Sequence, residues 1–168
     1  MLLLTFITAL RLCVSPTPSG SQAVARKILL AAAVHLTPVT LELGGKTPCL
    51  IYGRIDMKTA AKRLVWAKYF NAGQSCVAPD YILCTKETQD ALLPAIREAL
   101  EAFYGPDPQK CPDVGRIVTD KHWNHLMDLL GKSKGNVTIG GESTQEEKYI
   151  GKQGGGDKCI MSRNRDMD

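Results

Sequence analysis

The 168-residue sequence lacks most of the patterns that would assign it to a functional class at once. Its six cysteines form no CxxC pair and no metal-ligand spacing, so we expect no metal site and no disulfide framework. The formal net charge is only +4, without a basic run interleaved with aromatic residues, which argues against a nucleic-acid partner. We therefore expect a cytoplasmic protein with reduced thiols.

The sequence also has no apolar run long enough for a membrane-spanning helix. Residues 1–10, MLLLTFITAL, are strongly apolar, but no positive charge precedes them and no small-residue cleavage pattern follows directly. We expect residues 1–18 to lie outside the native fold, and a targeting segment is the alternative. In either case we expect no membrane anchor in this chain.

Cys76 lies in a stretch whose composition is typical of an accessible loop, NAGQSCVAPDY at residues 71–81. Before it, Asp56 is placed to cap a helix that should stop near Gly73, and residues 81–84 read as a short strand. The helix has apolar positions at the spacing of a buried face: Met57, Ala60, Ala61, Leu64 and Val65. A helix-to-strand turn can expose a nucleophile, whereas the alternative is a small, buried and inert cysteine.

A glutamate stands inside an apolar alternation in LELGGK at residues 41–46. In a strand, Val39, Leu41 and Leu43 would share one face, with Thr40 and Glu42 on the other. Burial near the strand end would raise the pKa of the carboxyl towards neutrality, as a general base requires. The pattern therefore makes Glu42 a candidate base.

The segment from residue 19 or 20 to about Val34 predicts a helix, with Val24, Ile28, Leu29 and Ala32 on one face. Its glycine-containing start would suit the phosphates of a dinucleotide, because a helix N-terminus offers free N–H groups. An amphipathic surface helix explains this stretch equally well.

Strand and helix patterns alternate along the rest of the chain, which predicts an α/β fold. We expect a strand at residues 49–52, helices at 86–104 and from Thr119 to Gly131, and a strand at 136–140. The last helix should turn Trp123, Leu126, Met127 and Leu130 inward. His122 and His125 are expected to face solvent, since no third metal ligand accompanies them. The glycine-rich tail after residue 150 is expected to be disordered.

The motif LELGGK followed by YFNAGQSCVAP resembles the aldehyde dehydrogenase superfamily, and the wording HLTPVTLELGGK with CVAPDYILC is most similar to its class 3 branch. Downstream, FYG and GRIV extend the resemblance, which covers residues 20–150. It implies a partial aldehyde dehydrogenase-like α/β fold. Residues 20–43 would end a Rossmann-like cofactor domain and 44–150 would begin the catalytic domain, with 1–19 and 151–168 outside the family pattern.

The resemblance also implies an activity, the NAD- or NADP-dependent oxidation of an aldehyde to a carboxylic acid. Cys76 would be the nucleophile and Glu42 the base that activates water. The backbone of Leu43 and Gly44 would line the nicotinamide, while Gly20 and Ser21 would lie near the phosphates. The implied partner is a small aldehyde, and full-length relatives are expected to be homo-oligomers.

The sequence departs from the family at several points. Ala23 and Ala25 stand where glycines are usual. The upstream oxyanion asparagine, the first cofactor-domain strands and the downstream glutamate of a phenylalanine-glycine-proline motif are not found. We therefore expect the 168-residue chain to be inactive alone, and the second hypothesis is a truncated, non-catalytic remnant.

Overall fold

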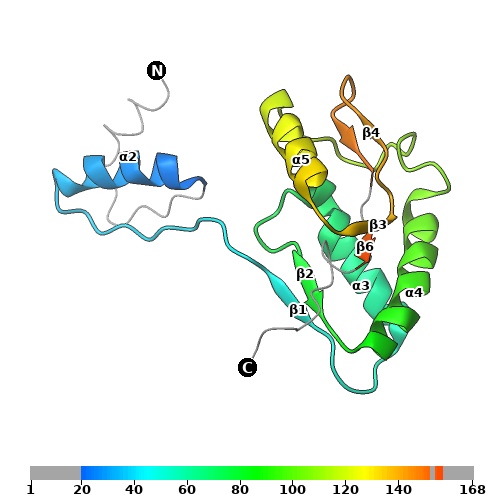
Figure 1. Cartoon of the computed structure of the whole chain (residues 1–168). Helices are drawn as coiled ribbons and strands as arrows, with labels where there is room; N and C mark the ends of the chain where they lie inside the picture. Colours follow the sequence, from blue (N-terminus) through cyan, green and yellow to red (C-terminus); the bar gives the residue numbers. More distant parts are fainter. Residues whose placement is uncertain (1–19, 152–153, 157–168) are drawn as a thin grey trace. The chain divides into compact units, whose positions relative to one another are not determined.

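The computed structural model describes residues 20–151 and 154–156, and the chain divides into two compact units, residues 1–45 and 46–168 (Figure 1). The expectation for residues 1–18 lies outside the described residues.

In residues 20–45, the described part of the first unit, helix α2 (Gln22–Ala33) confirms the predicted helix with slightly tighter ends. The Ser21 side chain caps it by accepting a hydrogen bond from the Val24 amide at 3.4 Å. Ala25, Ile28 and Ala32 are buried along one face. The predicted apolar face is therefore partly wrong, because Val24 and Leu29 are exposed and Ala25 takes their place.

The strand predicted from Val39 to Leu43 is wrong. This segment has only a single bridge at Glu42, whose carbonyl accepts a hydrogen bond from the Gly20 amide at 3.1 Å. Leu41 and Leu43 are half-buried, as their shared face predicts, but Glu42, which is expected to be buried, is exposed. A strand needs a ladder of backbone hydrogen bonds, and among the residues that the structure describes only the Gly20 amide bonds to this segment.

The second unit begins with a β–α–β arrangement, as the sequence predicts. Strand β1 (Pro48–Leu50) leads to α3 (Met57–Tyr69) and the 3-10 turn η1 (Phe70–Gly73), and β2 (Tyr81–Leu83) follows. Strands β1 and β2 pair in parallel, with Pro48 opposite Tyr81. The Asp56 carboxylate caps α3 by accepting hydrogen bonds from the Lys58 and Thr59 amides, which confirms the predicted cap.

Helix α4 (Lys86–Tyr104) packs against α3 and ends at Gly105, whose φ of 73° places it in the left-handed region. It runs through Pro94, because burial of its apolar face offsets the hydrogen bond that proline cannot donate. The side chains of this core are fully or nearly buried: Ile51, Ala61, Val65, Ile82, Leu92, Ala95, Ile96, Ala99 and Leu100. Together with the parallel strands they form the predicted α/β core.

Helix α5 (Asp120–Lys132) is capped by Thr119, as predicted, but differs from the prediction in two ways. It continues past Gly131 and ends where Ser133 turns to extended backbone, with ψ at 132°. None of its residues is fully buried: Trp123, Met127 and Leu130 are half-buried and Leu126 is exposed. His122 and His125 are exposed, as expected.

Short antiparallel pairs complete the second unit. Strand β4 (Ser143–Thr144) pairs with β5 (Tyr149–Ile150), and the predicted strand β3 (Asn136–Ile139) pairs with β6 (Gly154–Gly156). The prediction of a disordered tail is wrong for Gly154–Gly156, because strand pairing uses backbone groups and needs no apolar side chains. The rest of the tail lies outside the described residues.

Within residues 20–151 and 154–156, no helix combines the length and apolar character needed to cross a membrane.

Candidate functional site

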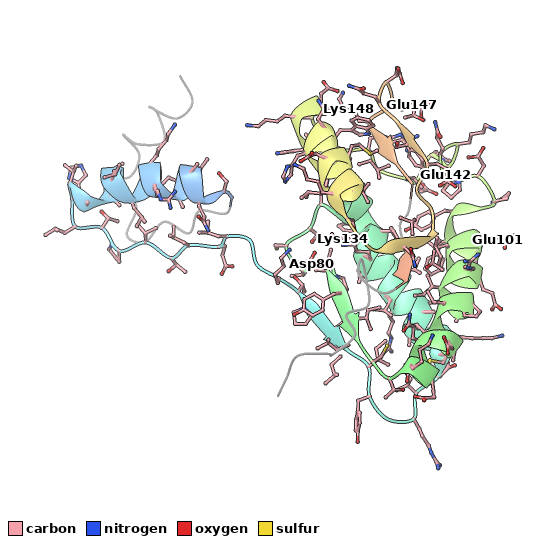
Figure 2. The ribbon with its side chains drawn as sticks, viewed as in Figure 1. Asp80, Glu101, Lys134, Glu142, Glu147 and Lys148 are labelled. Carbon is pink, nitrogen blue, oxygen red and sulfur yellow. The ribbon has the colours of Figure 1, made fainter. Side chains whose placement is uncertain are left out.

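Cys76 lies on the loop between α3 and β2, residues 70–80, which includes the turn η1. Its side chain is exposed. The loop begins where α3 ends at Tyr69 and finishes at Asp80, which Figure 2 labels directly before β2. Its neighbour Val77 is also exposed, whereas Ala78 is buried. The sequence prediction of an accessible thiol on a helix-to-strand turn is therefore confirmed.

The backbone before Cys76 adopts an unusual conformation. Asn71, Ala72 and Gly73 have positive φ values of 51°, 56° and 78°. Asparagine and glycine tolerate this region, but alanine pays about 1–2 kcal/mol for it. At Gly73 an added Cβ would also lie 3.2 Å from the carbonyl oxygen of Lys68. Surrounding contacts must therefore hold this turn in place.

Gln74 makes the contacts that hold the turn. Its Nε2 donates to the carbonyl of Asn71 at 3.1 Å and to that of Arg116 at 3.0 Å. Its Oε1 accepts a hydrogen bond from the Val118 amide at 3.1 Å. One side chain thus joins the loop to residues 116–118.

Thr47 and Asp80 hold the other end of the loop. The Asp80 amide donates to the Thr47 carbonyl at 2.9 Å, and the Thr47 amide donates to Oδ2 of Asp80 at 3.2 Å. The Thr47 hydroxyl donates to the backbone carbonyl of Cys76 at 3.3 Å. The cysteine is thereby attached to the start of the parallel strand pair.

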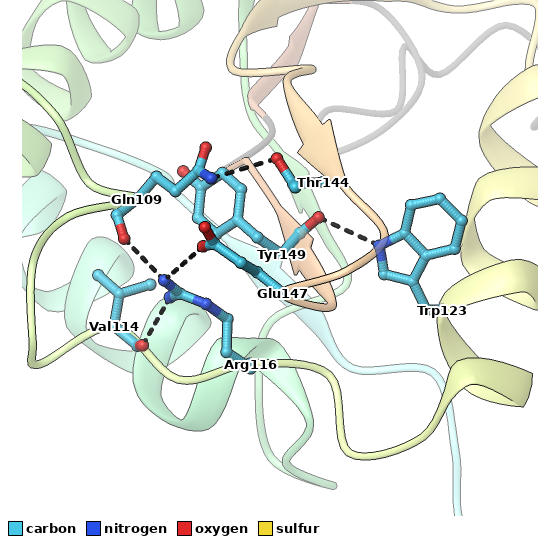
Figure 3. Close-up of polar contacts among 7 residues, drawn as sticks. All are labelled: Gln109, Val114, Arg116, Trp123, Thr144, Glu147 and Tyr149. Carbon is cyan, nitrogen blue, oxygen red and sulfur yellow. Dashed lines mark hydrogen bonds and ion pairs between the residues drawn. The ribbon is translucent and has the colours of Figure 1, made fainter.

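Arg116, whose carbonyl accepts a hydrogen bond from Gln74, is itself held by several contacts of its guanidinium. Figure 3 shows these contacts of the guanidinium. The guanidinium donates to the carbonyls of Gln109 at 2.7 Å and Val114 at 2.9 Å, and pairs with Glu147 at 3.3 Å. It also lies 5.0 Å from the ring centroid of Tyr149, a cation–π contact. The residues after Val114 are therefore tied to the β4–β5 hairpin.

A groove of about 820 Å³ borders the turn at Asn71–Gln74. It is bounded by Asn71–Gln74 of the loop, by Val118, and by Leu126 and Leu129 of α5. Cys76 does not line it. The groove is therefore not part of the immediate surroundings of the thiol.

The other described cysteines differ from Cys76 in exposure. Cys49 on β1, Cys84 after β2 and Cys111 are half-buried. Burial raises the pKa of the Cys49 thiol, and burial together with the nearby Cys49 raises that of Cys84. A raised pKa leaves less thiolate at neutral pH, and the thiolate is the reactive form.

We accordingly predict that iodoacetamide labels Cys76 faster than Cys49, Cys84 or Cys111 in the folded chain. Limited labelling followed by mass-spectrometric mapping measures the rate at each position. Labelling in urea provides the control, because unfolding should bring the rates of all four cysteines together. Faster labelling of Cys49 or Cys84 in the folded chain, with Cys76 protected, would contradict the prediction.

The proposed base, Glu42, and the proposed cofactor residues belong to the first unit. Glu42 is exposed there, so the burial expected from the sequence is not present. Cys76 belongs to the second unit, and the approach of the two side chains stays a prediction.

Of the proposed cofactor residues, Gly20 and Ser21 lie at a helix N-terminus, which suits a phosphate, while Leu43 is half-buried and Gly44 is exposed. Gly20 and Gly44 are exposed, and a Cβ built on either would meet no atom within 4 Å. Ser21 caps α2, so Gly20 and Ser21 stand at the helix end where N–H groups favour anions. Ala25, one of the two alanines in place of glycine, turns into the interior of the unit.

Within the part of the chain that the structure describes, no group of three or more His, Cys, Asp or Glu residues is arranged to hold a metal ion.

Comparison with known families gives one match that covers most of the chain. The model of the aldehyde dehydrogenase family matches residues 14–152. Among curated proteins, mouse aldehyde dehydrogenase family 3 member B3 is 52% identical over 132 residues, which cover 79% of this chain and 27% of the relative. The chain therefore spans about a quarter of the length of this relative.

Solved structures agree with the sequence match. The substrate-bound AldH of Staphylococcus aureus superposes with a TM-score of 0.80 at 39% identity, covering 89% of this chain and 32% of that one. An aldehyde dehydrogenase of Mycobacterium tuberculosis in complex with NAD⁺ gives 0.69 at 27% identity, covering 83% and 30%. In both matches the chain covers about a third of a longer enzyme.

Proposed function

The chain belongs to the aldehyde dehydrogenase family, and on this basis we propose that it contributes the nucleophile and base of an NAD- or NADP-dependent aldehyde oxidation. The observation that supports this proposal is the exposed Cys76 on a loop anchored at both ends. The substrate is a small aldehyde and the product is the corresponding carboxylic acid.

Cys76 provides the first step of the proposed mechanism. Its thiolate attacks the aldehyde carbon, and the former carbonyl oxygen becomes an oxyanion that backbone N–H groups stabilise. When bound, the nicotinamide cofactor supplies the hydride acceptor. Loss of hydride leaves the acyl group on Cys76 as a thioester.

Glu42 provides the second step. Its carboxylate takes a proton from water, and the resulting hydroxide attacks the thioester carbon and releases the acid. The exposure of Glu42 in the first unit leaves its carboxylate oxygens accessible to water. This step requires the Glu42 carboxylate to reach the acyl group on Cys76, and the proposed cofactor contacts are those of residues 20–21 and 43–44.

A chimera tests the proposal. Residues 20–150 of this chain replace the matching segment of the mouse family 3 member B3 relative, which supplies the remaining parts of a complete enzyme. We expect the chimera to form NADH or NADPH with a panel of aliphatic and aromatic aldehydes. The 168-residue chain, assayed in parallel, should form none. An inactive but folded chimera would argue against the proposed function and favour the non-catalytic remnant.

A further inference from the structure

The backbone on both sides of the Cys76 thiol is held by the side chains of Thr47 and Gln74, to which the sequence analysis assigned no role. On the side towards β1, the Thr47 hydroxyl donates directly to the Cys76 carbonyl at 3.3 Å. On the side towards α3, the Gln74 amide makes three hydrogen bonds to backbone groups. Cys76 lies two residues after Gln74, with Ser75 between them.

Both anchors are fixed to rigid parts of the second unit. Thr47 directly precedes β1 and exchanges hydrogen bonds with Asp80, which directly precedes β2. Gln74 is hydrogen-bonded to residues 116 and 118. This segment is in turn bonded to the β4–β5 hairpin. The Arg116 guanidinium donates to the Glu147 carboxylate, and the Ile117 amide donates to the Lys148 carbonyl at 3.0 Å. The loop is therefore hydrogen-bonded at one end to the start of the β1–β2 pair and at the other end to the segment that contacts the β4–β5 hairpin.

We propose that Thr47 and Gln74 are positioning residues that together set the direction of the Cys76 thiol. The proposal rests on the proposed function for its catalytic meaning, since a nucleophile must meet its substrate within a narrow range of angles. Neither residue touches the reacting atoms. Each acts through the backbone of Cys76 or of the turn before it.

The strain in the turn makes such anchors necessary. Asn71, Ala72 and Gly73 all have positive φ, and the only non-glycine residue there without a polar side chain is Ala72. Gly115 lies so close that a Cβ on it would be 3.4 Å from the Ala72 nitrogen. Without the Gln74 amide, the loop would lose its polar link to residues 116–118 and relax away from Gly115.

A nitroxide label on Cys76 of the 168-residue chain reports whether the loop becomes more mobile when an anchor is lost. Its electron paramagnetic resonance spectrum reflects nanosecond motion of the loop. Thr47→Val replaces the hydroxyl by a methyl group of similar size, and we expect the label's rotational correlation time to fall to about half. Thr47→Ser keeps the hydroxyl and should restore the wild-type spectrum. Unchanged spectra in Thr47→Val would overturn the role of Thr47.

Gln74 is tested with two variants and a matched control. Gln74→Ala removes all three hydrogen bonds and should shorten the correlation time to a similar extent. Gln74→Glu keeps an acceptor for the Val118 amide but loses both donors, so an intermediate value is expected. Gln145→Ala, at an exposed glutamine beyond the loop, should leave the spectrum unchanged. Equal spectra for Gln74→Ala and Gln145→Ala would overturn the role of Gln74.

Amide hydrogen exchange separates loosening of the loop from unfolding of the whole unit. We expect the Val118 amide to exchange about fivefold faster in Gln74→Ala, because its acceptor is removed. The Ala78 amide, which donates to the Ser75 carbonyl at 3.1 Å, should exchange faster in Thr47→Val. The Val65 amide in the α3 core should not change, and equal acceleration there would overturn the positioning role.

These measurements use neither aldehyde nor cofactor, so they fail separately from the proposed function. An inactive chimera together with a mobile loop in Thr47→Val would contradict the enzyme proposal and support the anchors. An active chimera with unchanged mobility in every variant would do the opposite.

Discussion

Replacing Cys76 by alanine in the chimera should reduce NADH or NADPH formation by roughly 10³-fold or more, because no other group forms the acyl intermediate. The measurement is the initial rate at saturating aldehyde and cofactor. Cys111→Ala is the matched control, since Cys111 is a half-buried cysteine in the turn after α4. Activity that survives Cys76→Ala would show that another residue is the nucleophile.

Glu42→Gln should act on the second step of the same reaction, with a different kinetic signature. The steady-state rate should fall about 10²- to 10⁴-fold, the usual contribution of a general base. Because Cys76 remains, the first turnover should still release up to about one equivalent of reduced cofactor per chain and leave an acyl group detectable by mass spectrometry. Glu101→Gln, at an exposed glutamate of α4, should change neither quantity. Loss of the first turnover would instead place Glu42 in binding or hydride transfer.

A second large effect is expected on stability. Leu92→Ala should lower the free energy of unfolding of the second unit by about 3 kcal/mol, within the 2–5 kcal/mol typical of buried leucines. The Leu92 side chain is 0% exposed and lies in the core that α3, α4 and β2 share. Removal of its outer carbons leaves a cavity that these packed elements fill only partly.

Urea denaturation followed by circular dichroism measures the change, with the α3 and α4 helices as the signal. Leu129→Ala on α5 is the matched control: this leucine is 50% exposed, and the cost should stay below about 0.5 kcal/mol. Similar midpoints for the two variants would mean that the core around Leu92 does not determine the stability of the unit.

The helices were predictable because their signals are local. Asp56 and Thr119 are capping residues next to apolar periodicity, and both cap helices in the structure. The position of Cys76 was predictable for a similar reason, since glycine, small polar residues and proline around it exclude regular structure.

The anchors of the loop were not predictable, because they depend on residues far apart in the chain. Gln74 bonds to Arg116 and Val118 at separations of 42 and 44 residues, and Thr47 bonds to Cys76 across 29. Local sequence patterns do not indicate which distant residues meet in such contacts. The strand expected around Leu41 failed for the related reason that alternation alone supplies no backbone partners, and within the described residues this segment is bonded only through the Glu42 carbonyl.

Strand β6 consists of three glycines, which weakens the specification of its register against β3. Its three residues pair with β3 through backbone groups alone, and the pairing shifts irregularly between Val137 and Ile139. In most strands a slip by one residue moves every side chain to the wrong face, but glycine has no side chain to misplace. Several alignments of β6 along β3 should therefore differ little in free energy.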